Sequence, residues 1–204
     1  MRFIKTDFDG LIIIKHDVIR DKRGFFKEKL KLELLQLHIN DKFNICQENS
    51  VMSKSNVLRG LHFQDDPYAQ SKLISVNYGK ILDIAVDIRK KSSTYGKYFS
   101  HVLSTENHES LFIPKGFAHG YITLSDFATI NYSVDNYYNP DAESGIPYDD
   151  SFLNIDWGIC KDKLIISEKD KNHNPFKPVS MGSLPVSGSQ TPYGDMSWVL
   201  NGRD

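Results

Sequence analysis

Short apolar segments broken by turn residues recur along most of the chain, which is the pattern of β-strands in a protein with many strands. Their close spacing is typical of a β-sandwich or β-barrel. We therefore predict a mainly β fold with a few short helices. The segments expected to be strands are 11–19, 43–47, 56–64, 72–78, 81–88, 98–104, 110–114, 120–124 and 128–138.

The segment 128–138 shows the clearest alternation of apolar and polar positions. Ala128, Ile130, Tyr132 and Val134 fall on one face of a strand, and polar residues occupy the positions between them. The Tyr132 phenol is therefore expected to point with apolar neighbours toward the interior of the protein.

One segment departs from the strand pattern. Leu30, Leu34 and Leu37 are spaced i, i+4 and i+7, which predicts a helix over 29–39 with these three residues on one face. Farther along, Tyr78-Gly79-Lys80 predicts a hairpin turn, and Pro114-Lys115-Gly116 predicts a loop.

The composition changes near residue 178. The chain beyond it is rich in Ser, Gly and Pro, unlike the apolar segments before it. We therefore predict one domain over residues 1–178, followed by a tail at 179–204 that is either loosely ordered or left by cloning.

The overall charge and the cysteine content exclude several classes of protein. Lys and Arg number 25 and Asp and Glu 26 in the 204 residues, so the net charge of −1 argues against a general nucleic-acid binder. The longest aliphatic run, 11–14, is too short for a membrane span, and the N-terminus lacks a secretory signal. Only Cys46 and Cys160 are present, which favours a reducing cytoplasm over a disulfide framework, and Cys46 is expected in the core.

Two of the seven histidines have a context that favours chemistry. His62 lies in an otherwise apolar strand, and His119 lies in a loop bracketed by glycines. A buried histidine needs a hydrogen-bonding partner or a function. Ordinary structural or surface roles are expected for the other five: His16, His38, His101, His108 and His173.

Charged residues also interrupt the apolar segments. Arg59, Lys72 and Asp83 either mark one solvated face of a sheet or, together with His62, line a polar pocket inside a barrel. Arg59 and His62 are three residues apart, so both can face one pocket only if the strand bulges between them, and a glycine stands at position 60.

Motifs for other kinds of site are absent from the sequence. Neither GxGxxG nor GxxxxGK[ST] occurs, so nucleotide binding by those loops has no support, and GxSxG is also missing. No second histidine follows His62 or His119 at i+2, so the ligand set for a catalytic metal is weak. The residues therefore do not favour a metal site.

Longer motifs carry a resemblance to a known family. They are DKRGFFKE (21–28), QENSVMSKSNVLRGLHFQ (47–64), QSKL (70–73), GKILDIAVDIRKKSSTYGKY (79–98), FIPKGFAHGYITLSD (112–126), YSVDNYYNPDAESGI (132–146) and SEKD (167–170). In this order the chain resembles the dTDP-4-dehydrorhamnose 3,5-epimerases, the RmlC-type sugar epimerases of the cupin superfamily. The resemblance covers 1–178, although KNHNPFKP at 171–178 departs from the more apolar text of the family.

The resemblance implies a cupin jelly-roll barrel, a cytoplasmic homodimer and a nucleotide-sugar substrate, with no cofactor, nucleic acid or membrane as partner. It implies that His62 is the general base, Tyr132 the general acid and Lys72 the group that stabilises an enolate. Asp170 would orient His62, with Asp83 as a second candidate. The resemblance also assigns substrate contacts to Arg23, Phe26, Glu28, Gln47, Asn49, Arg59, His119, Tyr138, Glu143 and Lys169, with 23–28 serving the pocket of a neighbouring subunit.

The implied reaction is epimerisation at C3 and C5 of dTDP-4-dehydro-6-deoxy-D-glucose. Both carbons flank the C4 carbonyl, so their protons are acidified, and a base and an acid on opposite walls could invert each centre. The alternatives are a mono-epimerase acting at C3 or C5 of another 4-keto nucleotide sugar, a sugar-nucleotide-binding cupin without catalysis, and a metal-dependent cupin oxygenase.

Overall fold

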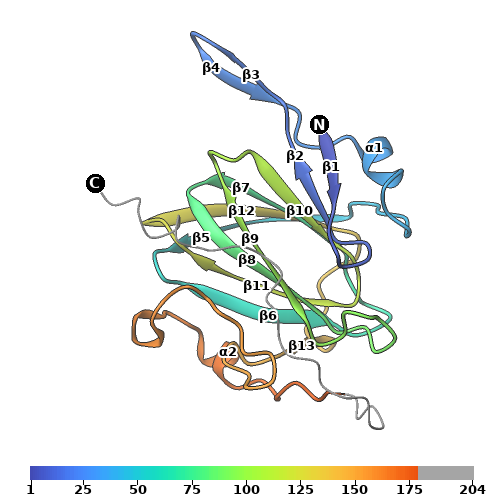
Figure 1. Ribbon diagram of the computed structural model, residues 1–204, viewed down its shortest axis with the longest axis vertical. Helices are drawn as coiled ribbons and strands as arrows, with labels where there is room; N and C mark the ends of the chain where they lie inside the picture. The colour runs from blue at the N-terminus through green and yellow to red at the C-terminus, as the bar shows by residue number, and fades with distance from the viewer. Residues whose placement is uncertain (179–204) are drawn as a thin grey trace.

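The computed structural model describes residues 1–178, and the segment 179–204, where the sequence predicts a tail, lies outside the described residues. The chain forms two antiparallel sheets packed face to face, as in a jelly roll (Figure 1), which confirms the predicted mainly β fold. In spatial order the larger sheet contains β1 (Arg2–Lys5), β2 (Ile12–Lys15), β10 (Glu109–Ile113), β7 (Lys72–Tyr78), β12 (Phe127–Val134) and β5 (Gln47–Lys54).

The smaller sheet has five strands and carries most of the candidate histidines and charged residues. In spatial order it contains β13 (Glu143–Gly145), β6 (Leu58–Gln64), β11 (Phe117–Thr123), β8 (Lys80–Asp87) and β9 (Tyr98–Ser104). The helical elements are short: α1 (Leu32–Gln36), the 3₁₀ turn Lys161–Lys163 and α2 (Glu168–Lys171).

Strand β8 shows how the layers are organised. Side chains alternate between faces along a strand, and Ile81 and Ala85 pack between the two sheets. Leu82 and Ile84 point to the opposite face, where the segment after β13 covers them with residues such as Trp157. Both faces of the smaller sheet are therefore buried, and Asp83 lies fully buried on the inner one.

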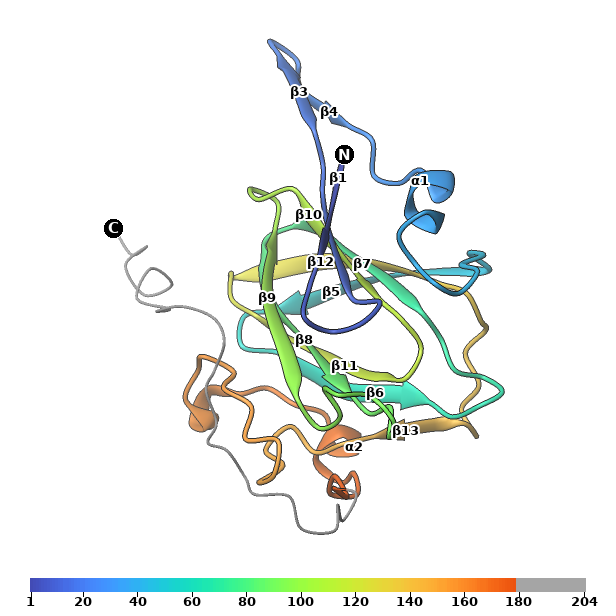
Figure 2. The ribbon, with the colours of Figure 1, turned by 45° about the vertical axis from the view of Figure 1, so that its right-hand side comes forward.

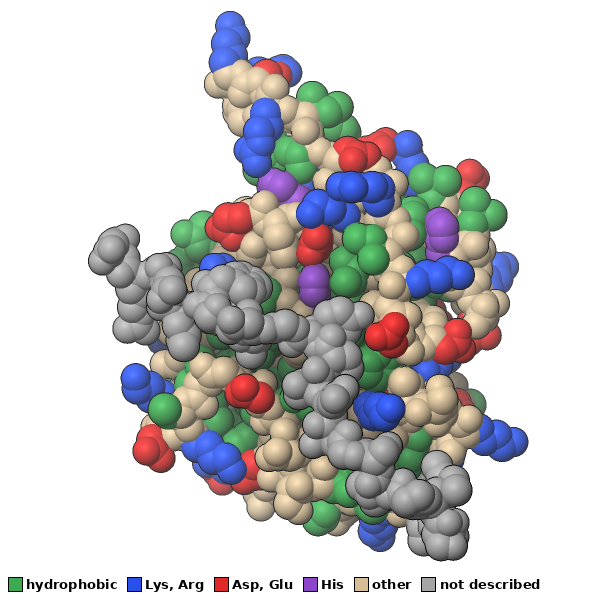
Figure 3. Space-filling view, viewed as in Figure 1, with side chains coloured by type: hydrophobic (Ala, Val, Ile, Leu, Met, Phe, Trp, Pro, Cys, Tyr) green, Lys and Arg blue, Asp and Glu red, His purple; other side chains and the backbone are tan. Residues whose placement is uncertain are grey.

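Strands β3 (Val18–Asp21) and β4 (Gly24–Lys27) form a two-stranded arm that projects away from both sheets (Figures 1 and 2). The expected strand 11–19 is thus divided into β2 and β3, because the chain leaves the larger sheet at residues 16–17 to enter the arm. Figure 3 shows basic side chains at the outer end of this arm. Its apolar side chains Ile19 and Phe26 are 68% and 62% exposed, so residues 1–178 leave them largely uncovered.

The prediction of a helix over 29–39 is wrong in its length, and the three leucines do not form its buried face. The helix α1 has five residues, and Leu35 is its buried side chain, whereas Leu34 and Leu37 are 38% and 78% exposed. Leu35 joins an apolar cluster with Ile12 on the outer face of the larger sheet. A helix of little more than one turn follows the surface that it covers, so the leucine spacing does not define its face.

The turn at Tyr78-Gly79-Lys80 is present, but the prediction of a hairpin is wrong. It connects β7 in the larger sheet to β8 in the smaller one, and the two strands are not paired. Gly79 has a φ of +80°, and a Cβ atom there would lie 2.3 Å from the Phe127 carbonyl oxygen. Only glycine fits this tight crossing between the layers.

Residues 43–46 of the expected strand 43–47 are not in a strand, and Cys46 is exposed instead of buried in the core. The strand in this region, β5, begins at Gln47 and runs to Lys54. Most of its residues are polar and one of its faces is exposed, so the apolar pattern does not reveal it. No helix among residues 1–178 is long and apolar enough to cross a membrane.

Candidate active site

A cavity of about 610 Å³ lies at one end of the space between the sheets, which is a size suited to a small organic ligand. Its walls come from strands of both sheets and from α2. The side chains that line it include Arg59, His62, Lys72, His119, Tyr121, Tyr132, Glu143, Lys169 and Asp170. The structure therefore brings His62 and Tyr132 to one shared space, together with Lys72.

His62 is held by a carboxylate from the far end of the chain. Its Nε2–H donates to Asp170 Oδ1 at 2.9 Å, and the Gly60 N–H donates to Asp170 Oδ2 at 3.2 Å. Burial raises the pKa of Asp170, but these hydrogen bonds and the nearby imidazole outweigh it, and the net pKa is lowered. Asp170 is therefore a carboxylate at neutral pH, and in the neutral form of His62 the proton lies on Nε2 and the lone pair on Nδ1.

A second histidine–aspartate pair lies directly beside the first. His119 is opposite His62 in the β6–β11 ladder, and its Nε2–H lies 3.0 Å from both carboxylate oxygens of Asp83. Asp83 thus orients His119 and not His62, which contradicts its candidacy as the partner of His62. The sequence also suggests a loop around His119, but the residue lies within β11.

The expected bulge between Arg59 and His62 is confirmed. Arg59 pairs with Tyr121 and His62 with His119, so three steps along β6 match two along β11. Gly60 has a φ of +118°, and a Cβ atom there would lie 2.5 Å from the Gly120 Cα. The bulge turns both Arg59 and His62 toward the cavity.

Lys72 supplies a cation to the cavity wall. Its ammonium group makes no hydrogen bond or ion pair with any other side chain within residues 1–178. Burial lowers the pKa of Lys72 to about 8, although the negative charges of Asp83 and Glu143 act in the opposite direction. The Lys72 amine is therefore mostly protonated at pH 7, and an unpaired ammonium is available for an anionic ligand.

Two tyrosines reach the cavity from opposite sheets. Tyr132 on β12 is the residue expected from the strand pattern, and burial raises its pKa above the usual value. Tyr121 on β11 is a residue that the sequence analysis did not select. Burial also raises its pKa, and its hydroxyl shares a 3.0 Å hydrogen bond with Ser53 Oγ, which accepts from Arg59 Nε. Both phenols therefore stay protonated near neutral pH.

Glu143 and Lys169 form an ion pair on the cavity wall, and Tyr138 O–H donates to the same Glu143 oxygen. These contacts raise the pKa values of Lys169 and Tyr138. Tyr138, Gln47 and Asn49 do not line the cavity. They form a connected group beside it, in which Gln47 accepts from the Tyr138 N–H and donates to Asn49.

Arg23, Phe26 and Glu28 are far from this cavity in their own chain. Arg23 and Phe26 lie on the projecting arm and Glu28 follows it, and Arg23 pairs with Asp21 at the tip. None of the three lines the cavity.

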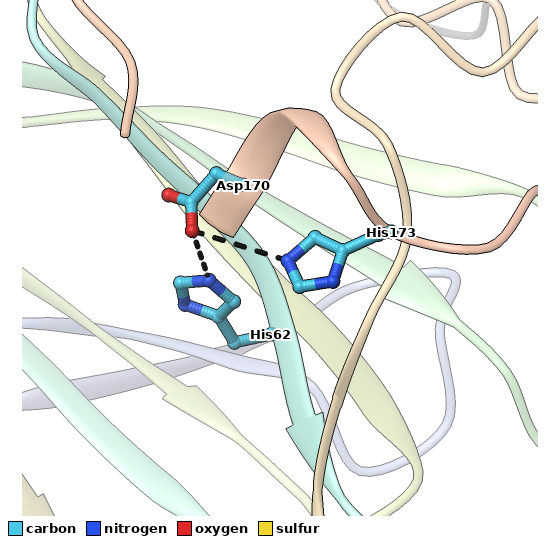
Figure 4. A group of neighbouring side chains, drawn as sticks. All are labelled: His62, Asp170 and His173. Carbon is cyan, nitrogen blue, oxygen red and sulfur yellow. Dashed lines mark hydrogen bonds and ion pairs between the residues drawn. The ribbon is translucent and has the colours of Figure 1, made fainter. Parts of the chain in front are cut away.

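His173 is a second residue that the sequence analysis missed. Its ring meets that of His62 edge to face with centroids 5.6 Å apart, and Figure 4 shows both rings directed at Asp170. Burial, and then the nearby His62, lower the pKa of His173. The sequence analysis did not place His173 beside His62, and only its position three residues after Asp170 hinted at the contact.

Known proteins are similar to this chain in both sequence and fold. A family model for dTDP-4-dehydrorhamnose 3,5-epimerase matches residues 5–178. The enzyme of that name from Methanothermobacter thermautotrophicus is 47% identical over 177 residues, covering 86% of this chain and 95% of that protein. The match therefore covers nearly the whole length of that relative.

Two solved structures extend the comparison. The dTDP-4-dehydrorhamnose 3,5-epimerase from Elizabethkingia anophelis superposes with a TM-score of 0.82 at 40% identity, covering 86% of this chain and 96% of that one. RmlC from Legionella pneumophila, solved in complex with dTDP-4-keto-L-rhamnose, gives a TM-score of 0.81 at 38% identity, covering 85% and 92%. Together these matches show that the chain belongs to the dTDP-4-dehydrorhamnose 3,5-epimerase family.

Proposed function

We propose that this protein epimerises C3 and C5 of dTDP-4-dehydro-6-deoxy-D-glucose and so forms dTDP-4-dehydro-L-rhamnose for dTDP-L-rhamnose biosynthesis. The observation that carries the proposal is one cavity lined by a carboxylate-held imidazole, a protonated phenol and an unpaired ammonium group: His62, Tyr132 and Lys72. The name and the complex of the Legionella relative support the choice of substrate.

The proton transfer begins at His62. With Asp170 accepting from Nε2–H, the Nδ1 lone pair removes the proton from the carbon next to the C4 carbonyl. The Asp170 carboxylate then stabilises the imidazolium that forms. The electron pair of the broken C–H bond moves into an enolate, and the negative charge develops on the C4 oxygen.

Lys72 stabilises that enolate. A fixed ammonium group beside a developing oxyanion in a site that excludes water lowers the barrier by several kcal/mol. Its lowered pKa also makes it a good partner for this step, because the charged form is poorly solvated before the enolate appears. The chemistry requires no redox cofactor and no metal.

Tyr132 returns a proton from the other face of the sugar. Its raised pKa keeps the phenol protonated, so it is ready to donate when the enolate collapses. Removal on one face and return on the other invert the centre. The His62 imidazolium then loses its proton to water and the Tyr132 phenolate takes one up, so the cycle can repeat at the second carbon and give double epimerisation.

Arg59, His119, Glu143 and Lys169 complete the cavity as substrate contacts in this proposal. Arg59 suits the diphosphate, since a guanidinium pairs well with phosphate oxygens. Gln47, Asn49 and Tyr138 lie beside the cavity, where the nucleotide would extend.

The proposal also includes a homodimer. The arm exposes Ile19, Phe25 and Phe26, and a second copy of the chain would bury this apolar surface. Arg23, Phe26 and Glu28 would then contribute to the pocket of the neighbouring subunit. A cytoplasmic location is part of the same proposal and agrees with two free cysteines.

The decisive test is incubation of dTDP-4-dehydro-6-deoxy-D-glucose with the protein in deuterium oxide, followed by NMR. Deuterium at both C3 and C5 with inversion at both supports the proposal, and label at one carbon only supports the mono-epimerase alternative.

Tyr132→Phe sharpens the same measurement. The variant retains His62, so proton removal and isotope exchange should continue while inversion falls on the order of 100-fold. Inversion at the wild-type rate in this variant would show that Tyr132 is not the acid.

A further inference from the structure

The cluster of His62, Asp170 and His173 contains one residue, His173, that the proposed proton transfer does not use. His62 comes from β6, Asp170 from α2 and His173 from the segment just after α2, and Figure 4 shows their side chains converging. One donor atom from each lies within 4.8 Å of the other two. Two imidazoles and one carboxylate form a ligand set that divalent transition metals favour.

The third ligand is unsatisfied in this structure. His173 Nε2 is buried and has no hydrogen-bond partner, and it lies 3.9 Å from Asp170 Oδ1, beyond hydrogen-bonding distance. The side chain of His173 is 11% exposed. A buried ring nitrogen without a partner is unfavourable, so a ligand that it could bind would stabilise this arrangement.

The local backbone makes room for His173. Gly145 is opposite His62 in the β13–β6 ladder, and a Cβ atom at position 145 would lie 2.5 Å from His173 Nε2. The absence of a side chain there allows the second imidazole to approach the first. Asp170 Oδ2 is occupied by the Gly60 N–H, so Oδ1 is the oxygen shared between the two rings.

We infer that these three residues form a binding site for Zn²⁺ and that metal binding switches off the base. Zinc bonds of about 2.0–2.2 Å place tetrahedral ligand atoms about 3.3 Å apart. The two separations from Asp170 Oδ1, 2.9 Å to His62 and 3.9 Å to His173, are close to that value on either side. All three ligand atoms lie within 4.8 Å of one another, so rotation of the side chains would bring them around one ion, with water in the fourth position.

The effect on proton transfer follows from the single proton of a neutral imidazole. Coordination through Nε2 of His62 replaces the hydrogen bond to Asp170, so the ring proton must occupy Nδ1. Neither nitrogen then has a free lone pair, and His62 cannot remove a proton from the sugar. This inhibition rests on the proposed function, whereas the metal site itself does not.

The test of the site is metal binding by the untagged chain in a buffer that does not chelate metals. We expect one Zn²⁺ per chain by calorimetry, and visible absorption typical of four-coordinate Co²⁺ when cobalt replaces zinc. His173→Gln should weaken Zn²⁺ binding at least about tenfold through loss of one ligand. Gly145→Ala should weaken it as well, by displacing the His173 ring, while His38→Gln changes an exposed histidine and serves as the matched control.

The test of inhibition compares each variant with its own metal-free rate. Wild type and His38→Gln should lose isotope exchange when Zn²⁺ is added and recover it with EDTA, whereas His173→Gln should need at least about tenfold more zinc. Equal zinc affinity and equal inhibition in wild type and His173→Gln would overturn the inference. If wild type has no epimerase activity at all, the calorimetry still decides the metal site independently.

Discussion

Two histidine–aspartate pairs lie side by side in the β6–β11 ladder, yet their surroundings differ. The imidazole of His62 is 29% exposed and lines the cavity, and its partner Asp170 comes from a helix near the end of the described chain. The imidazole of His119 is 10% exposed, and its partner Asp83 lies fully buried on the neighbouring strand. The same two residue types thus form a pair that is accessible from the cavity in one case and a more deeply buried pair in the other.

The difference bears on the proposed role of His62 as the base. Nε2 of His62 is bonded to Asp170, and the residue lines the cavity. The proposed proton transfer at Nδ1 therefore leaves the hydrogen bond to Asp170 in place. Asp83 is too deeply buried to lose the His119 N–H without a large penalty. It acts instead on Lys72, whose pKa its negative charge raises.

The largest expected effect comes from removing each imidazole in turn. His62→Ala should reduce kcat by about 10²- to 10⁴-fold with little change in the midpoint of thermal unfolding. His119→Ala should reduce the free energy of unfolding by about 1–3 kcal/mol, because Asp83 loses its donor, with a much smaller change in kcat. Thermal unfolding and steady-state kinetics measure both, and equal losses of activity and stability in the two variants would remove the distinction.

A smaller effect is expected from the carboxylates. Asp170→Asn removes the charge that stabilises the His62 imidazolium and fixes its tautomer, so kcat should fall on the order of 10- to 100-fold with KM nearly unchanged. Asp83→Asn keeps the shape of the buried pair and should affect kcat at pH 7 less. A larger loss of kcat in Asp83→Asn than in Asp170→Asn would contradict the assignment of His62 as the base.

The smallest expected effect is a shift in pH dependence. The pKa of Lys72 is about 8, so kcat should fall as pH rises through 8 and the ammonium loses its proton. Asp83→Asn removes a negative charge that raises this pKa, and the basic limb of the profile should move to lower pH. Glu143→Gln should move it in the same direction for the same reason.

Asp170→Asn is the matched control for that shift, since the charges acting on Lys72 are those of Asp83 and Glu143. Its basic limb should coincide with that of wild type. If the basic limb of Asp83→Asn stays where it is in wild type, or moves to higher pH, the titration of Lys72 does not cause the basic limb.

The strand pattern and the bulge were open to prediction from the sequence because they depend on local rules. Alternation along β12 correctly placed Tyr132 on the inner face, and the three-residue spacing of Arg59 and His62 required the bulge found at Gly60. The leucine spacing did not predict which residue of α1 is buried. Leu35 is buried because it packs against the outer face of the larger sheet. The turn at Gly79 was detected, but which sheets it joins is a property of the whole fold.

The sequence by itself determined the mainly β class, the family resemblance and the residue types of the cavity. The class follows from the spacing of apolar positions, and the other two follow from motifs that are continuous along the chain. Only the tertiary structure decided which aspartate serves which histidine. Asp170 is 108 positions from His62, and Asp83 is 36 from His119, so both pairings arise from chain crossings that no local pattern records. The approach of His173 to the same carboxylate depends on a glycine in another strand, and it too becomes visible only when the layers are packed.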